Sequence, residues 1–246
     1  MPFTFSHPAI ILPFARLKSS LISMSCLVVG SMTPDFQYFL QMKLSGRIGH
    51  TWHGAFIVDL PLAVLLVFIF HLIVKRPLID NLPAYFKSRL LALRDFDFFN
   101  GFKENTIGYL VCLQIGILSH IFWDSFTHAN AYFVEHMEFL SWNIDYEGMP
   151  NRPLFRYVQH ISTLIGGLIL GLFFHHMPKQ ETRGNISTGY WVLSAVFMII
   201  PFVIRSFYGY RFFGDFVVAC VSSFFLGFII AGTLNHSFFQ RIILRL

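Results

Sequence analysis

The segment His120–His128 carries three side chains that could bind a metal ion, spaced four residues apart. In a continuous helix, residues four apart lie on one face, so His120, Asp124 and His128 would point the same way. Imidazole nitrogen and carboxylate oxygen suit a borderline divalent cation such as zinc, and the central carboxylate could bridge two ions. The alternative is a polar helix end that Trp123 anchors in the membrane interface. Because ionisable groups are costly beside a membrane-length apolar run, a functional role is the default hypothesis.

A second group of candidate ligands precedes the apolar stretch Ala55–Val74. His50 and His53 are three residues apart, and at the start of a helix such a pair can face one ion. Asp59 lies one to two turns inside the stretch. Its carboxylate could pair with a hydrogen-bond donor or cation of a neighbouring helix, or it could hydrogen-bond a metal ligand and so orient it. The pattern favours neither role over the other.

The composition indicates that these residues belong to a membrane protein. Hydrophobic residues make up 55% of the 246 residues, and charged residues only 13%, about half of the roughly 25% that is usual in globular proteins. The 31 Phe residues fit lipid-facing and bundle-filling positions better than a soluble surface. No basic stripe is combined with a soluble recognition fold, so no nucleic-acid partner is expected.

Five apolar stretches match the hydrocarbon core of a bilayer, about 30 Å thick, in length. They are Ala55–Val74, Thr106–Trp123, Tyr157–Met177, Gly189–Ile204 and Phe216–Leu234. A further N-terminal stretch is interrupted by Arg16 and Lys18, which would cost roughly 2.5–3.5 kcal/mol each inside the membrane. A shallow hairpin of two short helices, Pro8–Leu17 and Leu21–Ser31, is the alternative to a single span. We therefore predict an all-α polytopic membrane helical bundle, with five spans plus the hairpin, or six spans.

Small residues recur at helical spacing in two of the last three stretches. Gly167 and Gly171 have the spacing of a close helix contact. A stripe of small residues in the last stretch is more typical of packing than of function; it comprises Ala219, Ser223, Gly227 and Ala231. We predict a single integral-membrane domain over residues 1–246, with the metal-site motifs in 1–160 and packing helices in 161–246.

The distribution of charge predicts the orientation. The segment Lys75–Lys103 is the most basic loop, whereas His128–Arg156 carries four acidic residues. The positive-inside rule places the basic segment in the cytoplasm and the acidic one outside. With this topology, seven residues from four segments fall at the outer ends of their helices. They are Asp35, His50, His53, His120, Asp124, His128 and His160.

Four motifs resemble an uncharacterised bacterial membrane-protein family of the domain-of-unknown-function type. They are Met1–Pro8 (MPFTFSHP), Gly30–Phe36 (GSMTPDF), His50–His53 and His120–His128 (HIFWDSFTH). The resemblance covers roughly the first two-thirds of the chain, through His160. The order of an early His, Pro-Asp, a His pair and His-x-x-x-Asp is also similar to the membrane-bound metal-dependent hydrolases, which are remotely related to zinc-dependent phospholipase C.

The hydrolase resemblance implies an all-helical site in which two or three zinc ions act on phosphoesters. By motif, it implies six ligands: His7, Asp35, His50, His120, Asp124 and His128. His53 and His160 would be further candidates. The chain departs from the hydrolase pattern at two points, since Arg47 precedes His50 instead of following the first paired His, and no late His-x-x-x-Glu follows His128. The third metal position therefore has no motif of its own.

The favoured hypothesis is a metal-dependent hydrolase that binds one to three divalent ions, most simply Zn²⁺, and cleaves a phosphoester or related amphiphile. His53 or His160 would carry the proton. We expect the protein in the bacterial inner membrane, with the lipid bilayer as its partner and the site toward the periplasm. The rival hypothesis is a non-enzymatic transporter or scaffold whose buried His and Asp residues carry ions or protons. The inverted repeat common in transporters is not detected.

Overall fold

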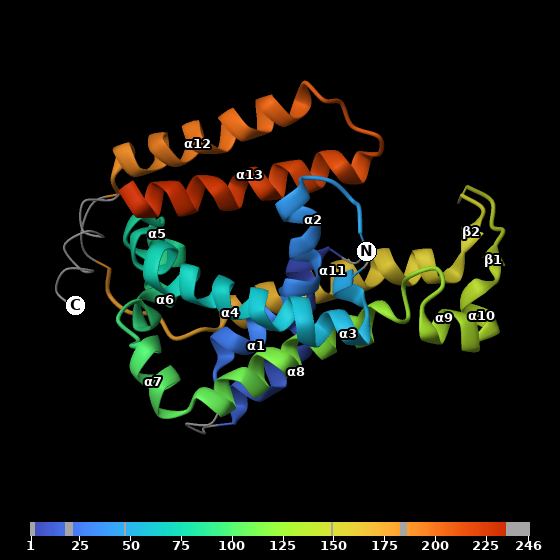
Figure 1. The fold of residues 1–246 in the computed structure, drawn as a ribbon, viewed down its shortest axis with the longest axis horizontal. Coiled ribbons are helices and arrows are strands. Elements are labelled where there is room, and N and C mark those ends of the chain that lie inside the picture. Colours follow the sequence, from blue (N-terminus) through green and yellow to red (C-terminus); the bar gives the residue numbers. More distant parts are fainter. Residues whose placement is uncertain (1–2, 18–21, 47, 149, 183–185, 235–246) are drawn as a thin grey trace. The chain divides into compact units, whose positions relative to one another are not determined.

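The computed structural model describes residues 3–17, 22–46, 48–148, 150–182 and 186–234, and most of these residues are helical (Figure 1). Five helices are long and apolar enough to cross a membrane. They are Trp52–Asn81, α8 (Thr106–Asp124), α11 (Leu154–His175), α12 (Thr188–Ser206) and α13 (Phe213–Leu234). Each contains or closely matches one of the five predicted spans. The predicted fold class, an all-α polytopic bundle, is confirmed.

The helix Trp52–Asn81 contains two π-helical stretches. In order, its parts are α3 (Trp52–Gly54), η4 (Ala55–Asp59), α4 (Leu60–Ile69), η5 (Phe70–Val74) and α5 (Lys75–Asn81). Thr51 begins the helix, because its hydroxyl accepts a hydrogen bond from the Gly54 N–H at 3.0 Å. Pro83 ends it, since a proline biases the preceding residue, Leu82, toward the extended conformation that it adopts here.

The N-terminal hairpin differs from the prediction in its first arm. That arm is a 3-10 helix, η1 (Thr4–Arg16), which begins four residues before the predicted start at Pro8. Two prolines inside it remove backbone donors, which disfavours a regular α-helix. The second arm, α1 (Met24–Met32), begins where the Ser23 hydroxyl accepts from the Cys26 N–H. The predicted boundary at Leu21, and the cations Lys18 and Arg47, lie outside the described residues.

The remaining elements are short. They are η2 (Thr33–Asp35), α2 (Phe36–Gln41), η3 (Ile48–His50), α6 (Ala84–Arg94), α7 (Phe98–Glu104), α9 (Tyr132–His136), α10 (Glu138–Ser141), and an antiparallel pair of strands, β1 (Asn143–Ile144) and β2 (Arg152–Pro153). The chain forms two compact units. The first unit comprises Met1–Asp35, Arg47–Val64 and Glu104–His176, and the second comprises Phe36–Gly46, Leu65–Lys103 and Met177–Leu246.

In the first unit, α1 packs against α8 at two glycines. A Cβ on Gly30 would lie 2.2 Å from the Leu113 carbonyl oxygen, and one on Gly116 would lie 2.4 Å from the Leu27 carbonyl oxygen. No side chain fits at either position, so the two backbones are in contact. Candidate ligands lie about one turn beyond this contact, His120 in α8 and Asp35 in η2, which directly follows α1. The glycine contact therefore brings the end of α1 close to the end of α8.

The small residues of α11 behave differently from the prediction. A Cβ on Gly167 or Gly171 would meet nothing within 4 Å among the described residues, so the predicted close contact there is wrong. The neighbouring Gly166 makes the close approach instead, with its Cβ position 2.9 Å from Ser6 in η1. The Ser6 hydroxyl also donates to the Thr163 carbonyl at 3.0 Å. These contacts hold η1 on α11.

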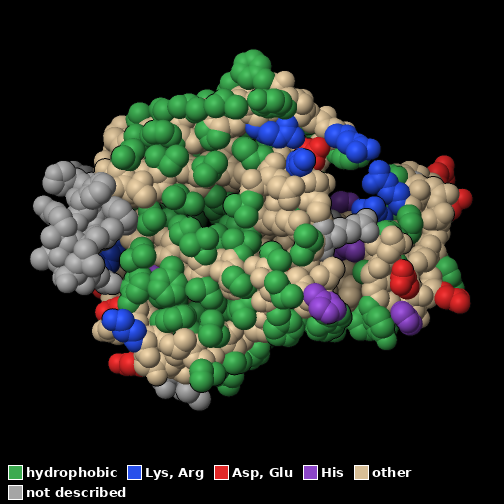
Figure 2. All heavy atoms as spheres, viewed as in Figure 1, with side chains coloured by type: hydrophobic (Ala, Val, Ile, Leu, Met, Phe, Trp, Pro, Cys, Tyr) green, Lys and Arg blue, Asp and Glu red, His purple; other side chains and the backbone are tan. Residues whose placement is uncertain are grey.

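In the second unit, α12 packs against α13 through the predicted small-residue stripe, all of which is buried. A Cβ on Gly227 would lie 2.7 Å from the Ser194 carbonyl oxygen of α12. The stripe is thus confirmed as packing. On its other side, α12 leaves Val192, Val196, Ile199 and Val203 exposed, and Figure 2 shows hydrophobic side chains gathered over this helix. Such a surface suits lipid contact.

Candidate metal centre

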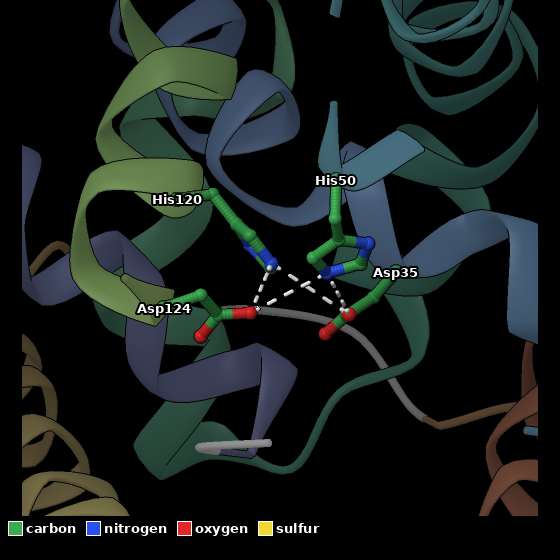
Figure 3. A group of neighbouring side chains, drawn as sticks. All are labelled: Asp35, His50, His120 and Asp124. Atoms are coloured by element: carbon green, nitrogen blue, oxygen red, sulfur yellow. Dashed lines mark ion pairs between the residues drawn. The ribbon is translucent and has the colours of Figure 1, made fainter. Parts of the chain in front are cut away.

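Four predicted ligands of the first unit point toward one another (Figure 3). They are Asp35, His50, His120 and Asp124, called the tetrad below, and one ligand atom from each lies within 4.8 Å of all the others. The Nε2 atom of His50 lies 3.4 Å from both Asp35 Oδ1 and Asp124 Oδ2. The Nε2 atom of His120 lies 3.6 Å and 3.3 Å from the same two oxygens. Three separate chain segments supply these residues.

The nitrogen–oxygen separations match four of the six edges of a tetrahedron around zinc, and the nitrogen–nitrogen and oxygen–oxygen separations lie within 4.8 Å. With Zn–N and Zn–O bonds of about 2.0–2.1 Å, tetrahedral geometry places neighbouring ligand atoms about 3.3–3.4 Å apart. The four nitrogen–oxygen separations in the tetrad range from 3.3 to 3.6 Å. The donor set, two imidazoles and two carboxylates, also suits a borderline divalent ion. The tetrad therefore fits such an ion in both chemistry and spacing.

The inward-pointing atoms are buried and make no hydrogen bonds. Among the described residues, this holds for Asp35 Oδ1, His120 Nε2 and Asp124 Oδ2. The side chains of Asp35 and His120 have no exposed surface at all. Burying polar atoms without hydrogen-bond partners costs several kcal/mol, of order 2–7 per group. A bound cation is the kind of partner that explains such a group.

Hydrogen bonds on the outer side of the tetrad orient two of its side chains, those of His120 and Asp35. His120 Nδ1 lies 2.8 Å from the Ser31 carbonyl oxygen, and because a carbonyl only accepts, Nδ1 carries the proton. The Nε2 lone pair is then free to face the other ligands. The Thr4 hydroxyl donates to Asp35 Oδ2 at 2.5 Å. Neither Thr4 nor Ser31 was predicted, since Ser31 acts through its backbone and a lone threonine gives no signal.

The other two predicted ligands, His7 and His128, flank the second oxygen of Asp124. His7 Nε2 lies 3.2 Å from Asp124 Oδ1, and its ring stacks on that of His120 with centroids 3.8 Å apart. His128 Nδ1 lies 3.6 Å from the same oxygen. All six predicted ligands are thus gathered around two carboxylates. Four form the tetrad, and two lie on the far side of Asp124.

His128 reaches this position by a turn rather than by the predicted continuous helix. Helix α8 ends at Asp124, and the next residues form turns. The His128 N–H still donates to the Asp124 carbonyl at 3.1 Å, and His128 Nδ1 lies 3.1 Å from the same oxygen. The prediction that one helix face carries His120, Asp124 and His128 is therefore wrong for His128. The three side chains nevertheless lie together.

The two predicted proton carriers, His53 and His160, are exposed. Neither makes a hydrogen bond, ion pair or ring contact with the tetrad among the described residues. Thr51 separates His53 from His50, because its extended backbone breaks the register between η3 and α3. The expectation that His50 and His53 face one ion is therefore not met.

Asp59 is buried behind His50. Its side chain belongs to η4 and is 1% exposed, and its Oδ2 makes no hydrogen bond among the described residues. A Cβ on Gly49 would lie 2.8 Å from Asp59 Oδ1 and 2.9 Å from the Pro34 carbonyl oxygen. Only glycine fits there. This close approach lets His50 enter between the segments that carry Asp35 and Asp59.

The electrostatics of the tetrad favour positive charge at its centre. Burial alone would lower the pKa of His50, but the carboxylates of Asp124 and Asp35 raise it to about 10. Burial alone would raise the pKa of Asp35. The neighbouring His120 and His50 lower it by more than burial raises it, so the pKa of Asp35 lies below its usual value. Burial lowers the pKa of His128 to about 4 against the opposing effect of Asp124. The two carboxylates thus together attract a cation to the centre of the tetrad, either as a proton on an imidazole or as another cation.

The chain belongs to the family described as Domain of unknown function (DUF4184), whose model matches residues 1–233. The predicted resemblance to a family of unknown function is confirmed, and the match extends well beyond His160. No curated protein and no solved structure matches the chain. The similarity to membrane-bound metal-dependent hydrolases therefore stays a prediction.

Proposed function

We propose that this member of the family is a membrane-bound metal-dependent hydrolase that cleaves a phosphoester or related amphiphile at the membrane–water boundary. The observation that carries this proposal is the tetrad. Its ligand atoms come from three separate segments, have nitrogen–oxygen separations close to those of a tetrahedral zinc site, and include three buried atoms without hydrogen bonds. In the ion-free protein a protonated His50 would pair with the two carboxylates at 3.4 Å, so an ion-pair cluster is the alternative that the metal content of the protein must distinguish.

A catalytic role requires more than the tetrad. Four protein ligands around one ion are typical of a structural zinc site, whereas catalytic sites keep one position open. Asp124 offers a second position through Oδ1, which His7 and His128 flank. His7 Nε2 and Asp124 Oδ1 would be donors there, and His128 Nδ1 would join them only by giving up its hydrogen bond to the Asp124 carbonyl. Water would fill the remaining positions. We therefore propose that the tetrad would hold one divalent ion and that His7, Asp124 and His128 would contribute to holding a second.

A bound divalent ion would supply a water with a pKa lowered from about 15.7 toward 7 and a positive charge near the leaving oxygen. The residues of the chain hold and orient the ligands: Ser31 fixes the tautomer of His120, and Thr4 fixes Asp35. The side chains of His50 and His128 are 16% and 28% exposed, in contrast to the fully buried Asp35 and His120. Substrate would approach on the His50 and His128 side. The proton-carrying roles of His53 and His160 stay predictions.

Metal content and phosphoester cleavage test this proposal together. The purified full chain should retain about two zinc or similar ions and cleave amphiphilic phosphoesters presented in detergent or vesicles. His120→Ala should lose both the metal and the activity, whereas His128→Gln should keep the tetrad ion and lose only cleavage. His136→Gln is a matched control, because this histidine is exposed. Protein that holds no metal after gentle purification and takes up none from added zinc would refute the proposal.

A second candidate function is ion or proton transport. It is favoured by the complete burial of Asp35 and His120, because buried ionisable groups in membrane proteins often mark ion pathways. Sealed vesicles containing the full chain would then show zinc or proton flux that Asp124→Asn removes. Such flux, together with a phosphoester panel that stays intact in the presence of metal-loaded protein, would decide for transport.

A further inference from the structure

The second unit contains a pocket between the α12–α13 loop and the segment that follows α2. Its volume is about 540 Å³. The charged residues that line it are Lys43, Arg205, Arg211 and Asp215, and Tyr208 and Tyr210 supply aromatic walls. Figure 2 shows Lys and Arg side chains gathered with an acidic side chain beside this loop. The pocket belongs to the second unit alone and is independent of the metal centre.

The Asp215 carboxylate holds the pocket together. One oxygen accepts a hydrogen bond from the Leu44 N–H at 2.8 Å, and the other accepts from the Arg211 N–H at 3.2 Å. The two lining segments are thus tied to the first turn of α13. Because both bonds come from backbone amides, Asp215 makes no ion pair with the cations of the pocket among the described residues.

The cations of the pocket have no carboxylate partners in the described chain. The Arg205 guanidinium donates from Nε to the Met42 carbonyl at 3.0 Å and from one terminal nitrogen to the Gly209 carbonyl at 2.6 Å. It also lies over the Tyr210 ring, 5.0 Å from the centroid. These neutral partners fix its position, and among the described residues of the pocket only the Asp215 carboxylate offsets its charge. Lys43 and Arg211 are exposed, so three cations face one carboxylate.

The pocket lies at the ends of two candidate membrane spans. Helix α12 ends at Ser206 and α13 begins at Phe213, so the loop between them would lie at the membrane boundary. Its aromatic residues are unusually exposed: Phe207 by 85%, Tyr208 by 82% and Phe213 by 80%. Exposed aromatic rings at the ends of spans are typical of the interfacial belt, where lipid headgroups lie.

We propose that this pocket binds the phosphate of an anionic phospholipid headgroup. Arginine and lysine are the usual ligands of phosphate, and a fixed guanidinium offers it directed donors. Basic pockets between membrane helices bind acidic headgroups on the cytoplasmic side, and the same chemistry would serve at the outer side, where the predicted orientation places this loop. The volume lies in the usual range for small-ligand sites, about 300–1,000 Å³. A lipid is favoured over free phosphate because the exposed apolar side of α12, including Val203 and Ile199, can receive acyl chains.

Calorimetric titration of the full chain in non-ionic detergent tests this site. The probes are short-chain phosphatidylglycerol, phosphatidylcholine of the same chain length, and inorganic phosphate. The test variant combines Lys43→Gln with Arg211→Gln, since both side chains are exposed and neither makes a hydrogen bond within the part of the chain that the structure describes. Phosphatidylglycerol should bind saturably and more tightly than phosphatidylcholine. The double variant should weaken this binding about 30-fold, from roughly fivefold for each cation near an anionic headgroup.

Lys179→Gln is the matched control, because it removes an exposed cation of the same unit outside the pocket. It should leave the affinity unchanged. Arg205→Lys keeps the charge but changes the donor geometry, and it should weaken binding by a smaller factor than the double variant. Three results would overturn the proposal: no saturable binding of phosphatidylglycerol, equal affinity in the double variant, or inorganic phosphate binding as tightly as the lipid. The last result would identify a site for the free ion.

Discussion

His120 and Asp35 each direct one polar atom toward the centre of the tetrad, because a hydrogen bond holds the other polar atom on the outer side. The Nδ1–H of His120 donates to Ser31, so in the neutral imidazole the Nε2 lone pair faces the two carboxylates. The hydroxyl of Thr4 holds one oxygen of Asp35 and leaves the other toward the imidazoles. Such outer hydrogen bonds reduce the rotation that a metal ligand must give up when it binds an ion.

Thr4→Val tests whether this outer hydrogen bond matters for metal affinity. The change keeps the shape of the side chain but removes the donor to Asp35, so the carboxylate loses its fixed orientation. Loss of such a partner typically weakens metal binding about 10–100-fold. Competition for zinc with a chelator would measure the change. Thr233→Val makes the same chemical change in α13, where the hydroxyl bonds only a helix carbonyl, and should leave zinc affinity unaltered.

The pH dependence of zinc binding follows from His50. Its pKa is raised to about 10 by Asp124 and Asp35 against the effect of burial, so near pH 7 the ion-free protein holds a proton on this imidazole. An ion must displace that proton, and its affinity should rise about tenfold per pH unit below pH 10. His128, with a pKa of about 4, is already neutral and adds nothing to this slope.

Zinc titrations at pH 6, 7 and 8 against a chelator of known pH dependence would measure this slope. His50→Gln should reduce the slope while lowering the affinity, because the displaced proton is gone along with one ligand. Zinc affinity that does not change across this range in the unaltered protein would contradict the assignment of the proton to His50.

The types of residue at the site were predictable, but the partners that orient them were not. His7, Asp35, His50, His120, Asp124 and His128 lie around the same two carboxylates, as the motifs indicated. Ser31 acts through a carbonyl that every residue type has, so no pattern marks it. His53 and His160 share the chemistry of the ligands and were grouped with them, yet their backbone positions leave both exposed.

Among the packing contacts between helices, the site depends most on the contact between α1 and α8. Gly30 lies five residues before Asp35, and Gly116 lies four residues before His120. A side chain at either glycine would meet the backbone of the partner helix at 2.2–2.4 Å. Because backbone cannot move aside as a flexible side chain does, the helices would have to separate, and the tetrad would open with them.

Gly116→Ala should therefore destabilise the first unit and weaken metal binding. Overpacking of this kind costs about 1–3 kcal/mol, although alanine favours a helix over glycine by up to about 1 kcal/mol. Gly167→Ala is the matched control, since its Cβ would meet nothing within 4 Å. Thermal unfolding in detergent and zinc stoichiometry would measure both effects. A Gly116→Ala protein with unchanged stability and metal content would show that the helices can separate without disturbing the site.

The long helices were predictable because membrane-length apolar runs dominate their sequences. All five predicted spans coincide with observed helices, and their ends differ by a few residues at most except in Trp52–Asn81. That helix extends past Val74 through Lys75 and Arg76, where falling hydropathy hid its continuation. The 3-10 form of η1 was not predictable from periodicity, because Pro8 and Pro13 alter its hydrogen bonding. The glycine contact was missed because the more regular spacing of Gly167 and Gly171 drew the prediction to α11.

At the scale of the whole molecule, the two units carry different kinds of chemistry. The first unit gathers carboxylates and imidazoles around a buried centre, and the second holds its arginines and lysines at the ends of helices. In the second unit, Arg94 pairs with Asp80 and Asp95 between α5 and α6. The charges in these short helices are thus partly structural. The positive-inside rule still counts them, because it depends on cations more than on net charge.

The orientation of the chain decides which compartment the metal centre faces. Six Lys and Arg residues lie in Lys75–Lys103, which forms α5 to α7, whereas the segment between α8 and α11 is acidic. We expect alkaline phosphatase fused after Lys87 to be inactive and the same reporter fused after Glu147 to be active, with a fluorescent protein giving the opposite result. A fusion after Glu181 serves as an internal control, because α8 and α11 both intervene and it must match Lys87. Active phosphatase at Lys87 and Glu181, with fluorescence at Glu147, would place Asp124 and the tetrad on the cytoplasmic side, and the substrates to be tested would then be cytoplasmic ones.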